Sequence, residues 1–135
     1  AFIKFASNRN KDAKHLKFAD EVNEDLYQNI FKKCTNFKTV GIIGVSFKPD
    51  SPVVIGSPSV KLINDLIKNH KNINVYDDLD ETFQNLNGVM TGIDRCRTAQ
   101  ECVDKSDVVV FMHPDKKYAI LNIQNKSIID NWGIF

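Results

Sequence analysis

The stretch that decides the fold is Thr39-Val-Gly-Ile-Ile-Gly-Val-Ser-Phe-Lys-Pro-Asp-Ser-Pro-Val-Val-Ile-Gly-Ser-Pro58. Its first part, residues 40–45, is rich in β-branched side chains and ends in a turn, which is typical of a buried parallel strand. Ser57 is a favourable N-cap and Pro58 a favourable first helical residue, so a helix is predicted to begin there. The loop between them leaves the carboxyl end of the strand, which is the edge where open α/β sheets bind ligands.

Lys48 lies on this loop, between the end of the predicted strand and the N-terminus of the predicted helix. Both features favour an anion, because a helix N-terminus presents free N–H groups and a positive dipole end. A lysine also suits a pyrophosphate as a mobile point charge. The simpler alternative, a lysine that only faces solvent, is left open by the residues themselves.

The rest of the chain alternates between strand-like and helix-like segments. We expect a helix that follows Ser57 and ends near residues 69–72, a strand at 73–76, a short helix at 80–86, a minor strand or extended loop at 89–91, a helix at 98–105, a strand at 107–112, a helical turn at 118–121 and a last strand at 127–130. Thr98 and Glu101 have the spacing of a capping box. This alternation predicts the α/β class, as a Rossmann-like, doubly wound, mostly parallel sheet of about five strands.

A long amphipathic helix is predicted before the first strand. Its apolar stripe recurs at steps of three and four residues and consists of Leu16, Ala19, Val22, Leu26 and Ile30. Phe2, Ile3, Phe5 and Ala6 indicate a shorter helix or helix end before it. The stripe needs a surface to cover, and that surface is either the sheet of the same chain or another chain.

Bulk composition narrows the class of protein. The 135 residues carry a net charge of +1 without a block of basic residues, which argues against nucleic-acid binding as the main activity. No stretch approaches the roughly 20 apolar residues of a membrane span, and the first residues lack the pattern of a signal peptide. We therefore expect a cytoplasmic protein that binds neither nucleic acid nor membranes.

The three cysteines, Cys34, Cys96 and Cys102, follow no metal-binding or redox spacing. The three histidines do not cluster with them along the sequence. We expect no metal site, and we expect the cysteines to be small, semi-buried residues in a reducing compartment.

Residues 41–50, together with Ser57-Pro58, resemble the start of the C-terminal nucleotide-sugar-binding domain of the UDP-glucose/GDP-mannose dehydrogenase family. Residues 20–24 are similar to a Glu-Val-Asn-Glu segment on that family's long central helix. Three places depart from the family pattern. Ile55-Gly56 stands where the family carries Arg-Glu, Pro52-Val53 replaces an acidic pair, and Trp132 replaces an arginine near the end of the domain.

The resemblance implies the C-terminal part of an NAD-dependent nucleotide-sugar 6-dehydrogenase of the UDP-glucose type. Residues 1–36 would then end a central helical region that forms a homodimer, and residues 37–135 would bind the UDP-sugar. The implied substrate-binding residues are Phe47, Lys48, Pro49, Ser57 and His113. NAD would be bound mainly by a missing N-terminal domain, so no cofactor-binding residue is assigned here. The family's Gly-Gly-x-Cys-Phe-Pro-Lys-Asp motif with its nucleophilic cysteine is not in this sequence, and we expect no turnover and no catalytic residue from this chain alone.

Some alternatives stay open at this point. The departures at Ile55, Gly56 and Trp132 favour a non-catalytic nucleotide-binding or regulatory module with a decayed site, whereas the Phe47-Lys48-Pro49 loop favours part of an enzyme. Asp77 and Asp78, at the end of the second strand, suit a ribose contact or a solvated turn. His113 suits a ligand contact or a general base.

Overall fold

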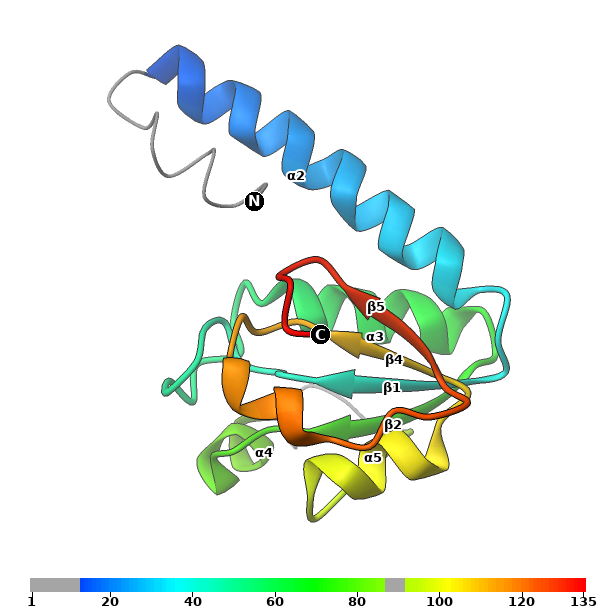
Figure 1. Ribbon diagram of the computed structural model, residues 1–135. Coiled ribbons are helices and arrows are strands. Elements are labelled where there is room, and N and C mark those ends of the chain that lie inside the picture. Colours follow the sequence, from blue (N-terminus) through cyan, green and yellow to red (C-terminus); the bar gives the residue numbers. More distant parts are fainter. Residues whose placement is uncertain (1–12, 87–91) are drawn as a thin grey trace.

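The structure is a computed structural model that describes residues 13–86 and 92–135. Its centre is a sheet of five strands in the order β3-β2-β1-β4-β5. The strands are β1 (Thr39–Ile43), β2 (Asn72–Tyr76), β3 (Ile93–Arg95), β4 (Val108–Phe111) and β5 (Ser127–Asp130). All four neighbouring pairs are parallel, so the predicted α/β, doubly wound sheet is confirmed (Figure 1).

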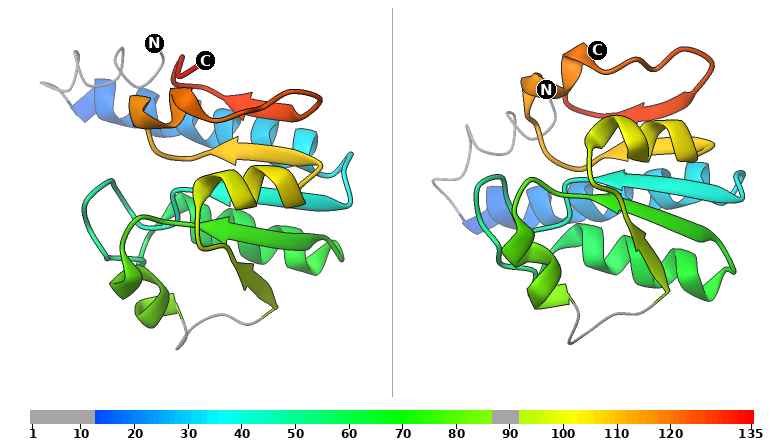
Figure 2. Two further views of the ribbon diagram at one scale, coloured as in Figure 1. Left: turned by 60° about the horizontal axis from the view of Figure 1, so that its bottom comes forward. Right: turned by 90° about the horizontal axis from the view of Figure 1, so that it is seen from below.

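Helices cover both faces of this sheet (Figure 2). Two of them, α2 (Ala13–Cys34) and α3 (Pro58–Lys68), lie on one face, and α5 (Ala99–Lys105) lies on the other. Two shorter elements, α4 (Asp80–Leu86) and the 3₁₀ helix η1 (Lys116–Ile120), follow β2 and β4. The expected long helix, the helix after Ser57 and the helical turn are therefore all present.

Side chains of the central strands alternate between two hydrophobic clusters, because successive strand residues point to opposite faces. Ile42 and Val110 belong to the cluster beneath α2 and α3. Ile43 and Val109 belong to the cluster beneath α5. The central strands are thus buried on both faces, which explains why β1 and β4 are continuous β-branched runs in the sequence.

Two helix starts follow the local signals in the sequence. Ser57 is the N-cap of α3 and its side chain accepts a hydrogen bond from the Ser59 N–H. Thr98 is the N-cap of α5 and accepts from the Glu101 N–H, while the Glu101 carboxylate accepts from the Arg97 N–H. Both predicted caps are confirmed. The Glu101 side chain accepts from Arg97, the residue before the N-cap, and not from the N-cap residue Thr98 itself.

The apolar side chains in the described part of α2 pack on the domain of the same chain. Ile30 is buried in the cluster beneath α3, and Leu26 packs against it. Tyr27, which lies outside the predicted stripe, is also buried, and its hydroxyl donates to the Asp65 carboxylate. Leu16, Ala19 and Val22 lie outside the described side chains, and the predicted helix near Phe2 lies outside the described residues.

The minor strand or extended loop expected at 89–91 lies outside the described residues. The third strand of the sheet, Ile93–Arg95, was not predicted from the sequence. This is an edge strand in which Asp94 and Arg95 are exposed, so it lacks the apolar run that marks a strand in the sequence.

The three cysteines are free and fully buried, more completely than the semi-buried state expected. Burial raises the pKa of the Cys34 thiol to about 12. Within the described residues, no helix is long and apolar enough to cross a membrane.

Candidate functional site

Two loops leave the carboxyl edge of the sheet on either side of the point where the strand order reverses. Residues 44–57 follow β1 and residues 112–115 follow β4, and these two strands are neighbours in the sheet. The chain runs from β1 through β2 to β3 on one side, and from β4 to β5 on the other. Such a reversal is where open α/β sheets bind their ligands.

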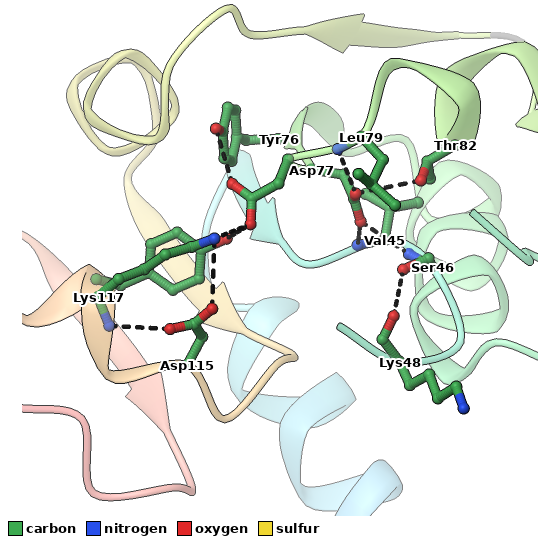
Figure 3. A network of polar contacts seen from close by, with 11 residues as sticks. Val45, Ser46, Lys48, Tyr76, Asp77, Leu79, Thr82, Asp115 and Lys117 are labelled. Atoms are coloured by element: carbon green, nitrogen blue, oxygen red, sulfur yellow. Dashed lines mark hydrogen bonds and ion pairs between the residues drawn. The ribbon is translucent and has the colours of Figure 1, made fainter. Parts of the chain in front are cut away.

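Asp77, which follows β2, holds the first residues of the loop after β1 (Figure 3). Its Oδ2 accepts from the N–H of Val45 at 2.9 Å and of Ser46 at 3.1 Å. Its Oδ1 accepts from the Leu79 N–H at 3.1 Å and from the Thr82 hydroxyl at 3.2 Å. Asp77 is 5% exposed, so it is not part of a solvated turn. Its carboxylate forms hydrogen bonds with other groups of the protein itself.

His113, which follows β4, lies against the same loop from the other strand. Its Nε2 lies 2.9 Å from the Ser46 carbonyl oxygen, and because a carbonyl only accepts, this nitrogen carries a proton and donates it. The ring covers Gly44, where an added Cβ would lie 2.5 Å from the His113 Cγ. With 6% of its surface exposed, His113 is buried against the start of the loop that follows β1. Direct contact of Nε2 with a ligand would require breaking this bond.

Ser57 closes the other end of the loop. Besides capping α3, its hydroxyl donates to the Val45 carbonyl at 2.6 Å, and the neighbouring Ser59 hydroxyl donates to the Gly44 carbonyl at 2.6 Å. Ser57 is buried. Its hydroxyl is therefore committed to the protein and ties the start of α3 to the end of β1.

The tip of the loop faces solvent. Phe47 is 55% exposed, Lys48 is exposed and Pro49 is half-buried. The tip is held by the Phe47 N–H, which donates to the Val53 carbonyl at 2.7 Å, and by the Ser46 hydroxyl, which donates to the Lys48 carbonyl at 2.8 Å. Of the five predicted site residues, only Phe47, Lys48 and part of Pro49 are thus open to a ligand.

A pocket of about 250 Å³ opens beside Phe47, between α2, the loop, the end of β4 and the chain after β5. Phe47, Tyr27 and Trp132 give it aromatic walls, and Ser46 and Asn131 add polar groups. The Trp132 Nε1 donates to the Phe111 carbonyl at 2.8 Å, which fixes the indole ring. Sequence reasoning missed Tyr27 as a wall of this pocket, because the residues that form it are far apart in the chain.

Asp78 takes part in a separate polar network beside η1 (Figure 3). Its carboxylate accepts from the Tyr76 hydroxyl at 2.9 Å and pairs with the Lys117 ammonium, which also lies 3.3 Å from Asp115. The hydrogen bond from the Lys117 backbone N–H is the main reason why the pKa of Asp115 is lowered. Asp78 is therefore an exposed ion-pair partner in this structure, in the turn that follows β2.

Comparison with known proteins agrees with this architecture. The UDP-glucose/GDP-mannose dehydrogenase family, UDP binding domain, matches residues 41–135. Among solved structures, a UDP-glucose dehydrogenase from Pyrobaculum islandicum superposes with a TM-score of 0.74 at 20% identity, covering 96% of this chain and 31% of that one. A GDP-mannose dehydrogenase from Pseudomonas aeruginosa gives 0.75 at 22% identity, covering 98% and 34%.

These structural likenesses establish the fold. The chain spans about a third of the length of each of these two dehydrogenases. No curated protein sequence matches it. The family match covers more than half of the chain and includes the end of β1, the loop 44–57 and Trp132. This chain therefore belongs to the UDP-glucose/GDP-mannose dehydrogenase family, of which it carries the UDP-binding domain.

Proposed function

We propose that the chain is the C-terminal part of an NAD-dependent nucleotide-sugar dehydrogenase of the UDP-glucose type, and that it binds the UDP end of the substrate. The observation that carries the proposal is the exposed Phe47-Lys48 tip beside an aromatic pocket at the carboxyl edge of the sheet. Residues 37–135 would form the binding domain, and residues 1–36 would end a central helical region.

The site offers two kinds of contact that a nucleoside diphosphate needs. Lys48 supplies a cation on an exposed loop, where it can meet a phosphate. Phe47 and Trp132 supply aromatic faces against which a planar ring can stack. In this proposal the diphosphate lies at Lys48 and the nucleoside lies in the pocket.

The described residues lack the features that a binding site for NAD would need. β1 and the turn after it have Gly41-x-x-Gly44 and lack the Gly-x-Gly-x-x-Gly fingerprint of dinucleotide sites. Asp77, the acidic residue at the position that would bind a ribose, already accepts four hydrogen bonds from the protein. We therefore assign NAD, and the oxidation of the sugar C6 alcohol to a carboxylate, to the rest of a longer protein.

A second candidate is a non-catalytic module that keeps the nucleotide site. Val53 and Ile55 are 49% and 85% exposed, at or beside positions where the family carries charged groups. Trp132 lines the pocket where the family has an arginine. At Ile55 and Trp132 these differences replace two cations, which could bind phosphate, with uncharged side chains. If the full-length protein binds UDP but does not reduce NAD with UDP-glucose, this second candidate replaces the first.

Binding of UDP by the chain, followed by calorimetry or amide chemical shifts, tests the proposal. With half of a closed site absent we expect a Kd on the order of 0.1–1 mM. A hydrogen bond between Lys48 and a phosphate would contribute to binding, although less than a buried one because it is exposed to water. Removing it in Lys48→Ala should therefore raise the Kd about tenfold. Lys38→Ala is the matched control, since it removes an exposed charge before β1, at the opposite edge of the sheet. Equal affinity of wild type and Lys48→Ala would move the site elsewhere.

We also propose a homodimer that uses α2, on the strength of the resemblance and of the prevalence of two-fold pairing. The described α2 side chains Ile30 and Leu26 pack on their own domain, so the contact between subunits is assigned to the part of the helix before them. A mass of a single chain by light scattering at high concentration contradicts this assembly.

A further inference from the structure

We propose that Asp77 is a positioning residue for ligand binding: it holds the loop after β1 in the conformation that presents Phe47 and Lys48. This inference rests on the proposed function. Asp77 lies 30 positions away from Phe47 and acts on the loop through the main chain of Ser46. The hydrogen bonds at both sides of Ser46 and the burial of these groups support this role.

The Asp77 carboxylate satisfies two successive backbone donors at the start of the loop, the N–H groups of Val45 and Ser46. Both residues are buried, so these donors have no easy access to water. A carboxylate is an acceptor through both oxygens, which lets Oδ2 face the loop while Oδ1 bonds Leu79 and Thr82. The same group thereby joins the loop after β1 to the start of α4.

Ser46 is held from its other side as well. Its carbonyl accepts from His113 Nε2 at 2.9 Å, while its N–H donates to Asp77. The main chain of Ser46 is therefore fixed between the ends of β2 and β4. Phe47 follows directly, and the Ser46 hydroxyl bonds the Lys48 carbonyl. Figure 3 shows Ser46 between Asp77 and Lys48. A shift of Ser46 would therefore move both side chains that the proposed function places at the ligand.

Because the two oxygens of Asp77 bond different segments, variants can separate its effect on the position of the loop from its effect on the stability of the fold. Thr82→Val removes one bond to Oδ1 in the buried interior and leaves both bonds from the loop to Oδ2. Asp77→Ala removes all four bonds. Asp77→Asn keeps one carbonyl oxygen, which can still accept from Val45 and Ser46, so it should partly restore what alanine loses.

The experiment measures the Kd of the chain for UDP and the exchange rates of the Val45 and Ser46 amide protons, under conditions where each variant is folded. Asp77→Ala should raise the Kd about tenfold and speed exchange of both amides at least about tenfold, because their acceptor is gone. Asp77→Asn should fall between alanine and wild type, and Thr82→Val should match wild type in both measurements. If Asp77→Ala does not fold, the comparison of Asp77→Asn with Thr82→Val carries the test.

The outcomes are distinguishable. Fast amide exchange in the Asp77 variants with an unchanged Kd overturns the inference, because loop position then does not set affinity. Equal weakening of binding by Thr82→Val and Asp77→Asn also overturns it, in favour of general destabilisation. If the wild type does not bind UDP, the proposed function fails. The role of Asp77 in holding the loop is then judged by the exchange rates alone, and unchanged rates refute it.

Discussion

The base and the tip of the loop 44–57 differ in almost every physical property. At the base, Gly44 and Ser46 are buried and their backbone groups bond side chains from three other segments. At the tip, Phe47 and Lys48 face solvent, and Ile55, near the other end, is the most exposed of its large apolar residues. The difference shows that the two parts of the loop have different roles. Buried polar groups set the path of the chain, and exposed side chains are left free to meet a ligand.

This division agrees with the position of the Arg-Glu replacement within the loop. Ile55 and Gly56, which replace an Arg-Glu pair, are both exposed, so their change alters no buried contact. The groups that hold the base, by contrast, are buried and hydrogen-bonded to one another. Substitutions at the base should therefore affect the free energy of unfolding, and substitutions at the tip should affect binding alone. The following variants test this comparison, from the largest expected effect to the smallest.

Gly44→Ala should be the most destabilising change in the loop. Gly44 has a φ of 93°, and its added Cβ would meet the His113 ring at 2.5 Å. Backbone strain and overpacking together should lower the free energy of unfolding by about 3 kcal/mol, as measured by denaturant titration. Gly56→Ala is the control, because Gly56 also has a positive φ of 78° but its Cβ would meet nothing closer than 3.9 Å. It should cost about 1 kcal/mol, and equal costs at the two positions contradict the comparison.

Ser57→Ala should have an intermediate effect. It removes the N-cap of α3 and the hydrogen bond to the Val45 carbonyl. The expected loss is about 1–2 kcal/mol in the free energy of unfolding. Ser51→Ala is a matched change at the tip, where the hydroxyl accepts one exposed bond from the Val53 N–H at 3.3 Å. Thermal or denaturant unfolding should place it within about 0.5 kcal/mol of wild type. A larger effect of Ser51→Ala than of Ser57→Ala would reverse the assignment of base and tip.

Ile55→Thr should change stability least. Ile55 is 85% exposed, and a β-branched residue replaces another, so we expect the free energy of unfolding to stay within about 0.5 kcal/mol. The same denaturant titration measures it. A loss above about 1 kcal/mol would show that Ile55 packs against the protein in solution, and the tip would then not be free.

The elements with a local signal were predicted correctly from the sequence. The β-branched run of β4 and the cap at Ser57 each depend on neighbouring residues, whose spacing is visible in the chain. Edge strand β3 was missed because two of its three residues are exposed and polar. Lys48 was correctly expected on an exposed loop, whereas its contact with a phosphate stays a prediction.

By itself, the sequence determined the alternation of strands and helices and the loop that follows β1, because hydrophobic periodicity and helix caps act over a few residues. Only the tertiary structure decided what Asp77 does. Its hydrogen-bond partners Val45 and Ser46 lie 32 and 31 residues away, and no local pattern records such a pairing. The same holds for the pocket, in which Tyr27, Phe47 and Trp132 meet. A strand or a cap is a property of adjacent residues, but a site is a property of segments that only folding brings together.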